Sequence, residues 1–149
     1  KTPKPQNPNC YNYKKISSEE LLALPVDILI PAALENQINH GNAEKIKAKI
    51  ILELANGGID PTVDEQLAKR GIVVLPDVLA NAGGVAVSYF EWLQNLKKER
   101  WTEHQVAQKL EKIMVKSFND FWQLQQKYQI TPRLAAFVLG IKRIVAAMK

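Results

Sequence analysis

The stretch Asn81-Ala-Gly-Gly-Val-Ala-Val-Ser-Tyr-Phe-Glu-Trp92 decides how the rest of the chain is interpreted. It follows an apolar run that ends at Pro76-Asp77, and it opens a long apolar helical pattern. This order predicts a strand-to-helix turn at the two glycines. Glycine lets the backbone approach a ligand closely, and the first N–H groups of a helix have no partner within that helix. The stretch is therefore a candidate ligand-binding turn, although an ordinary helix start would show the same spacing.

Three short apolar runs precede this stretch, at residues 26–30, 49–54 and 72–75. Apart from Asp27, the first run has no polar alternation, which is the pattern of a strand covered on both faces. The strands are separated by helical segments, and parallel strands joined in this way need right-handed crossovers. We therefore expect an α/β fold, namely a partial doubly wound, Rossmann-like parallel sheet of about three strands with flanking helices.

Helix boundaries can be predicted from capping patterns. Ser17 with Glu20, and Thr62 with Glu65, have the spacing of capping boxes, and a short helical segment is expected at residues 42–48. Gly71 would end the helix that starts at Thr62, because that position favours a positive φ.

A helical C-terminal region is expected from about residue 102. Thr102 and Gln105 form another capping-box pattern at the start of a long amphipathic helix, and Thr131-Pro132 begins the last helix. The apolar spacing of that last helix predicts a buried stripe made of Leu134, Phe137, Val138, Ile141, Ile144 and Val145.

Composition excludes several classes of protein. The chain has 149 residues, of which 46% are hydrophobic and 23% charged, as in ordinary globular domains. No apolar run approaches the ~20 residues of a membrane span and no signal peptide is visible, so we expect a soluble, cytoplasmic protein without a membrane partner.

The net charge of +5 comes from scattered lysines, which argues against nucleic acid as a partner. Cys10 is the single cysteine and His40 and His104 lie far apart, so neither a disulfide framework nor a metal site is expected. Residues 1–15, rich in Pro, Asn and Lys, are expected to form a loop or a ragged N-terminal end.

Three ordered motifs resemble the glutamate dehydrogenase family of amino-acid dehydrogenases. They are Pro31-Ala-Ala-Leu-Glu-Asn-Gln-Ile38, Ala55-Asn-Gly57 and the stretch that begins at Asn81. The resemblance runs from about Ile16 to Lys149. Each motif follows the carboxyl end of an expected strand, where open doubly wound sheets bind their ligands.

The resemblance implies a role for particular residues. Those matching Ala32, Ala33 and Asn36 lie along a dinucleotide, NAD or NADP. The residue matching Asn56 reaches the nicotinamide ribose, and that matching Asn81 lies by the nicotinamide amide. Val85 and Ser88 would line the substrate pocket, and their spacing of three residues is consistent with one helix face. The implied reaction interconverts L-glutamate with 2-oxoglutarate and ammonia, in an enzyme that is a homo-oligomer when full length.

Other features limit this interpretation. Tyr89-Phe-Glu-Trp92 favours glutamate over the substrates of the leucine, phenylalanine and valine dehydrogenases, whereas Leu54 stands where the family usually has glycine.

No GxGxxG motif is present, and the family's catalytic lysine and aspartate belong to a domain N-terminal to these residues. We therefore expect residues 16–149 to be the C-terminal portion of an NAD(P)-binding domain, with no catalytic residue and no activity alone. The alternatives are a catalytically silent module, a leucine or phenylalanine dehydrogenase, and, as the weakest, a catalytic carboxylate pair at Asp77 and Glu91.

Overall fold

The structure is a computed structural model that describes residues 15–148. Cys10 and nearly all of the N-terminal segment 1–15 lie outside the described residues. The elements are, in chain order, α1 (Ser18–Leu22), β1 (Ile28–Leu29), η1 (Ala43–Lys45), β2 (Ile50–Leu52), η2 (Pro61–Val63), α2 (Asp64–Lys69), β3 (Val73–Leu75), α3 (Asp77–Ala80), α4 (Ala82–Lys97), α5 (Glu103–Tyr128) and α6 (Pro132–Ala147).

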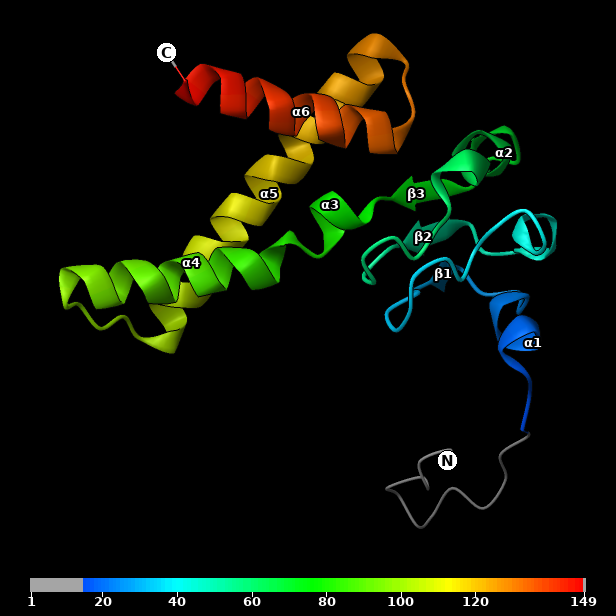
Figure 1. The fold of residues 1–149 in the computed structure, drawn as a ribbon, viewed down its shortest axis with the longest axis horizontal. Helices are drawn as coiled ribbons and strands as arrows, with labels where there is room; N and C mark the ends of the chain where they lie inside the picture. Colours follow the sequence, from blue (N-terminus) through cyan, green and yellow to red (C-terminus); the bar gives the residue numbers. More distant parts are fainter. Residues whose placement is uncertain (1–14, 149) are drawn as a thin grey trace.

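The sheet has three parallel strands in the order β1-β2-β3, with helices alongside it, which confirms the predicted fold class (Figure 1). In its register, Ile28 pairs with Ile50, and Ile51 pairs with Val74. An isolated parallel bridge between Ile38 and Ile59 continues the pairing beyond the strands. Because the strands are parallel and adjacent, their three carboxyl ends meet at one edge of the sheet.

Only one face of the sheet is well covered in the described part of the chain. Ile51 and Val74 point into a core that also contains Ile38, Ala43, Ile46, Ala48, Ile59, Val63, Leu67 and Ile72. The opposite face leaves Ile28, Ile30 and Val73 exposed by 53%, 49% and 40%. The expectation that the first strand is covered on both faces is therefore wrong for this chain, because η1 and α2 supply side chains to one face only.

The first capping prediction is confirmed and the second is wrong. The Ser17 hydroxyl accepts the Glu20 N–H at 3.1 Å, and the Glu20 carboxylate accepts the Ser17 N–H at 2.7 Å. Thr62, however, is not a helix cap. Asp60 takes that role because its carboxylate accepts the Thr62 N–H at 2.9 Å, and Pro61 then begins the short 3₁₀ turn η2 ahead of α2. Hydrogen bonds from the Thr62 hydroxyl and N–H lower the pKa of Asp60.

The turn predicted at the paired glycines is also wrong. The chain leaves β3 at Pro76, enters the single-turn helix α3 at once, and passes through Asn81 into α4. Gly83 and Gly84 lie inside the first turn of α4 with ordinary helical backbone, and a Cβ at Gly84 would meet nothing within 4 Å. The break after the strand therefore comes from Pro76 and not from the glycines, since Pro76 has the extended conformation of a residue that precedes a helix.

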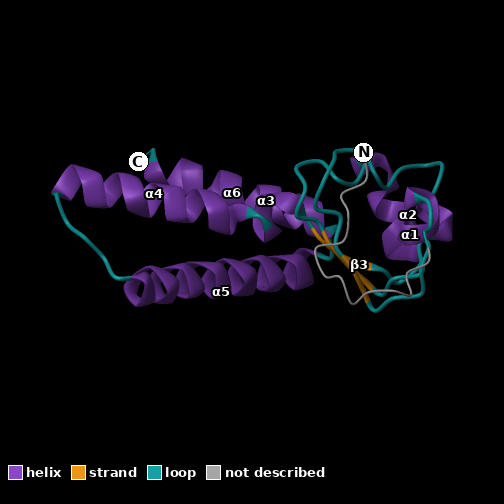
Figure 2. Ribbon diagram, turned by 90° about the horizontal axis from the view of Figure 1, so that it is seen from below, coloured by secondary structure: helices purple, strands orange, loops and turns teal. Residues whose placement is uncertain are grey.

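The three long helices α4, α5 and α6 extend together away from the sheet (Figure 2). The Thr102–Gln105 capping box is confirmed at the start of α5. A second core joins α3, α5 and α6, and Leu75 at the end of β3 packs against it. Its buried residues are Leu79, Phe121, Leu124, Ala135 and Ala136. Among the described residues, no helix is both long enough and apolar enough to cross a membrane.

The buried stripe predicted for α6 is wrong in most of its members. Leu134, Phe137, Ile141, Ile144 and Val145 are each at least 49% exposed. The residues that α6 does bury are Arg133, Ala135 and Ala136. Helix α6 therefore packs on the second core through Ala135 and Ala136, with Val138 and Leu139 partly buried beside them, and the five residues named above are turned outward.

Candidate functional site

The loops after β1 and β2 are joined at the carboxyl edge of the sheet. The Asn36 N–H donates to the Gly57 carbonyl at 2.7 Å, and the Gln37 N–H donates to the Gly58 carbonyl at 2.9 Å. Asn36 and Gly57 both have positive φ, of 53° and 60°. Asparagine and glycine tolerate this conformation best, so each loop has a suitable residue where the chain reverses.

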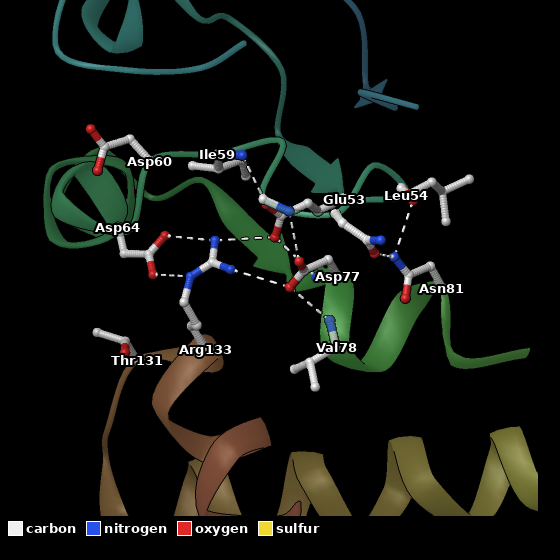
Figure 3. Close-up of polar contacts among 12 residues, drawn as sticks. Glu53, Leu54, Ile59, Asp60, Asp64, Asp77, Val78, Asn81, Thr131 and Arg133 are labelled. Carbon is white, nitrogen blue, oxygen red and sulfur yellow. Dashed lines mark hydrogen bonds and ion pairs between the residues drawn. The ribbon is translucent and has the colours of Figure 1, made fainter. Parts of the chain in front are cut away.

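The second and third motifs meet through their asparagines. The side-chain amide of Asn81 donates to Asn56 Oδ1 at 2.6 Å and to the Leu54 carbonyl at 3.2 Å (Figure 3). Leu54 takes part through its backbone, and its own N–H donates to the Pro31 carbonyl at 3.0 Å. The leucine that departs from the family pattern is thus held on both sides by backbone contacts.

Ala32 and Ala33 lie on the same edge. Both are exposed, and they directly follow Pro31, whose carbonyl accepts the N–H groups of Leu54 and Ala55. Together with Asn36, Asn56 and Asn81, they form an edge with exposed backbone and several amide groups. Amides both donate and accept hydrogen bonds, so this edge suits a ligand that carries carboxamide and hydroxyl groups. The residues present therefore fit the nicotinamide and ribose that the sequence resemblance implies.

Val85 and Ser88 lie on α4, beyond Asn81. Both side chains are exposed, and Val85 is 72% exposed. The Ser88 hydroxyl donates to the Gly84 carbonyl at 3.2 Å, four residues earlier in the same helix. Their place on one face of α4 agrees with the predicted spacing, while their role in a substrate pocket stays a prediction.

A buried ionic cluster beneath this edge was missed by the sequence analysis. Glu53 is 0% exposed and follows β2 directly. Its Oε1 accepts the Ile59 N–H at 2.8 Å, and its Oε2 accepts the Asp77 N–H at 3.0 Å. A glutamate inside the apolar run 49–54, two residues after the buried Ile51, was the available signal, because a charge placed toward the core needs a partner.

Arg133, the second residue of α6, is that partner. Its Nη2 lies 3.1 Å from Glu53 Oε2, its Nε 2.7 Å from Asp64 Oδ2 and its Nη1 3.4 Å from Asp77 Oδ1 (Figure 3). Burial disfavours the charged guanidinium, but the hydrogen bond to Asp64 and the three carboxylate charges outweigh it and raise the pKa of Arg133. Arg133 therefore stays charged and links the end of β2 to α2, α3 and α6.

Four other candidates have ordinary roles. Asp77 accepts the N–H groups of Gly57 and Val78, at 2.8 and 2.7 Å, and pairs with Arg133. Glu91 is an exposed residue of α4. Asp77 is thus committed to the buried cluster, and the hypothesis of a catalytic pair has no support. His40 and His104 are exposed, and His40 contacts the Thr62 hydroxyl at 2.9 Å.

A parallel sheet with flanking helices, and with polar loops at the carboxyl ends of its strands, is typical of part of a doubly wound α/β protein, a class that binds its ligands at that edge. The model of one protein family, Glutamate/Leucine/Phenylalanine/Valine dehydrogenase, matches residues 4–149. The chain belongs to this family.

Individual relatives agree with the family assignment. The chain is 54% identical over 136 residues to an NAD-specific glutamate dehydrogenase of Clostridioides difficile, covering 91% of this chain and 32% of that protein. It is similar to the crystal structure of glutamate dehydrogenase from Peptoniphilus asaccharolyticus, with a TM-score of 0.77, 44% identity and coverage of 82% of this chain and 31% of the other. It is also similar to the hetero-hexameric glutamate dehydrogenase of Thermus thermophilus, with a TM-score of 0.82, 27% identity and coverage of 86% and 31%. The chain spans about a third of the length of the curated relatives it matches.

Proposed function

We propose that this chain is the C-terminal portion of the NAD(P)-binding domain of a glutamate dehydrogenase, and that it carries the nicotinamide half of the cofactor site. The contact between Asn56 and Asn81 carries the proposal, because it brings two motifs from different loops together at the ligand-binding edge of the sheet. The proposed reaction is the oxidative deamination of L-glutamate to 2-oxoglutarate and ammonia. NAD or NADP would supply the hydride chemistry when bound.

The residues of this chain bind and orient. The Asn81 amide would hold the nicotinamide carboxamide and the Asn56 amide its ribose, while Ala32, Ala33 and Asn36 would lie along the rest of the dinucleotide. Val85 would contact the methylene groups of glutamate, and the Ser88 hydroxyl would donate to a substrate carboxylate. The relative from Clostridioides difficile is described as NAD-specific, which supports NAD ahead of NADP.

The full-length protein is proposed to be a cytoplasmic homo-oligomer. Exposed apolar side chains on α4 and α6 support association, because patches of this kind mark interaction surfaces. The Thermus thermophilus structure, described as hetero-hexameric, shows that one relative assembles into six subunits.

Titration of the full-length protein with NADH, followed by nicotinamide fluorescence, tests the proposal. Asn81→Ala should weaken NADH binding by about 10-fold, because a hydrogen bond is worth about 0.5–1.5 kcal/mol and the Asn56 side chain also loses its partner. Asn95→Ala, which removes an exposed asparagine near the other end of α4, is the matched control and should bind like the wild type.

Two results would contradict the proposed function. No fluorescence response at millimolar NADH would favour a catalytically silent module. Faster turnover of leucine or phenylalanine than of glutamate would assign the protein to another branch of the family.

A further inference from the structure

We propose that Glu53 is a positioning residue of the cofactor site, which holds the loops that carry Asn56 and Asn81 in register, with Arg133 as its counter-ion. The effect on the cofactor rests on the proposed function, whereas the effect on the loops does not. Neither residue lies at the exposed edge, so both would act through the backbone above them.

The two oxygens of Glu53 hold two different segments of chain. Oε1 accepts the N–H of Ile59, at the far end of the loop that contains Asn56. Oε2 accepts the N–H of Asp77, the first residue of the short helix that leads to Asn81. Asp77 in turn accepts the Gly57 N–H at 2.8 Å. The Asn56 loop is thus tied to the start of α3 by two carboxylates, and the contacts of Asn81 lie beside them (Figure 3).

A carboxylate and a guanidinium are both needed for this arrangement. Two N–H donors and a cation converge on Glu53, and a carboxylate accepts at both oxygens. Glutamine has one carbonyl oxygen, so its NH₂ group would face either a backbone N–H or the Arg133 guanidinium. A buried carboxylate without a cation is strongly unfavourable, and Arg133, itself only 9% exposed, supplies that cation from a distant part of the chain.

Stability alone does not account for the cluster. Well-packed apolar residues often stabilise a fold as much as a buried ion pair does, and the buried Ile51 lies only two positions before Glu53. What apolar residues cannot provide is a fixed direction for the Ile59 and Asp77 N–H groups. The direction of these N–H groups matters if the loops place groups that contact a cofactor. A displacement of such groups by about 1 Å can lower activity as much as 100-fold.

The experiment compares Glu53→Gln with Ile51→Ala in the full-length protein. Both substitutions should lower the stability of the protein, but only Glu53→Gln changes the carboxylate that accepts hydrogen bonds from the loops. We expect Glu53→Gln to weaken binding of NADH by about 10- to 100-fold relative to ADP, which lacks both the nicotinamide and its ribose. Ile51→Ala should lower the Tm and leave the ratio of the two affinities unchanged. In hydrogen exchange, residues 55–60 should exchange faster in Glu53→Gln, relative to the strand amides, than in Ile51→Ala.

The proposal would be overturned if both variants changed the affinity ratio, and the exchange of residues 55–60, in the same proportion to their loss of stability. If Glu53→Gln does not fold, Glu53→Asp is compared in the same way, because it keeps the charge but is one methylene too short to reach both N–H groups. If the wild type does not bind NADH, the proposed function fails, and the exchange of residues 55–60 alone decides whether Glu53 positions the loops.

Discussion

At the scale of single residues, the contacts of Asn81 could not be predicted from the motif that contains it. The motif placed Asn81 at a ligand site, but its contacts come from Leu54 and Asn56, on another loop. Amide groups at fixed separation provide specificity for a polar ligand, because an unmatched ligand would leave them without partners. Under the proposed function, the contact between the two asparagines is part of the recognition surface, and neither motif alone predicts it.

Ser88 gives a test of the substrate pocket at the same scale. In the full-length enzyme, Ser88→Ala should lower kcat/KM for glutamate by roughly 10- to 150-fold, since a hydrogen bond to a charged group is worth about 1.5–3 kcal/mol. To donate to a substrate, the hydroxyl must leave the Gly84 carbonyl that it now contacts. NADH binding should stay nearly unchanged.

Norvaline, which lacks the side-chain carboxylate, is the control substrate for that variant. Steady-state kinetics on both substrates separate the two roles of the serine. Equal losses on glutamate and norvaline would show that Ser88 does not contact the side-chain carboxylate. An unchanged kcat/KM on both substrates would lead to the same conclusion. That result is expected of a purely structural position, because alanine is the better helix former.

Glu53 and Arg133 mark the limit of residue-level prediction. Local patterns placed Asn36, Asn56 and Asn81 on one edge of the sheet, because the carboxyl ends of parallel strands must meet there. The sequence contains a glutamate in a strand and an arginine at a helix start, but nothing local pairs them. Their contact depends on how α6 packs against β3, which is a tertiary property.

At the scale of elements, the sequence predicted helix starts correctly where the cap depends only on residues close together in the chain. The boxes at Ser17 and Thr102 involve side chains three residues apart, so sequence is sufficient to identify them. The prediction failed at Thr62, where Asp60-Pro61 is a stronger helix start only two residues earlier. It failed again at α6, because periodicity shows which residues share a face and not which face is covered.

The contact between α5 and α6 predicts a dependence on pH. The Asp120 carboxylate accepts Lys116 Nζ at 2.8 Å and Arg143 Nη2 at 2.9 Å. These hydrogen bonds, first that of Lys116 and then that of Arg143, lower the pKa of Asp120 below its ordinary value of 3.8. A lowered pKa stabilises the fold above the ordinary value, and this contribution is lost as the pH falls through the lowered one.

Urea denaturation of the wild type and of Asp120→Asn measures that contribution. The wild type should have a slightly higher midpoint at pH 7, and the difference should close on acidification below pH 3.8. We expect a small effect, because exposed ion pairs are screened by water and salt. Glu111→Gln removes another exposed carboxylate of α5 and should show no such closing difference. A difference for Asp120→Asn that is constant with pH would contradict the assignment.

At the scale of the whole molecule, the proposed function gives the described chain the binding edge of a site and assigns proton transfer to groups outside these residues. Asp77, the acidic residue nearest to Asn81 among the candidates, is engaged with Arg133 and two backbone N–H groups. The purified 149-residue chain should therefore show no measurable oxidation of glutamate with NAD or NADP. General acid–base catalysis alone contributes about 100- to 10,000-fold, and orientation by further residues contributes more. Turnover above background, in a preparation free of full-length enzyme, would show that the chain carries catalytic groups of its own.

The exposed apolar faces lead to a prediction for the same purified chain. Along α6 and its C-terminal cap, apolar residues recur at steps of three and four and are all at least 49% exposed, namely Leu134, Phe137, Ile141, Ile144 and Met148. On α4, Val85, Tyr89, Trp92 and Leu96 form a similar exposed series. Apolar stripes with this spacing are buried when helices pack side by side, and the uncovered face of the sheet adds Ile28, Ile30 and Val73.

The chain should therefore self-associate at micromolar concentrations. Size-exclusion chromatography with light scattering should give a mass above that of one 16.8 kDa chain, or a broad, concentration-dependent peak. Ile141→Glu places a charge in the middle of the α6 stripe, so it should shift the equilibrium toward the monomer. Lys142→Glu changes the neighbouring position without touching the stripe and is the control. A sharp monomer peak for the wild type, together with cooperative unfolding, would mean that these faces do not drive association.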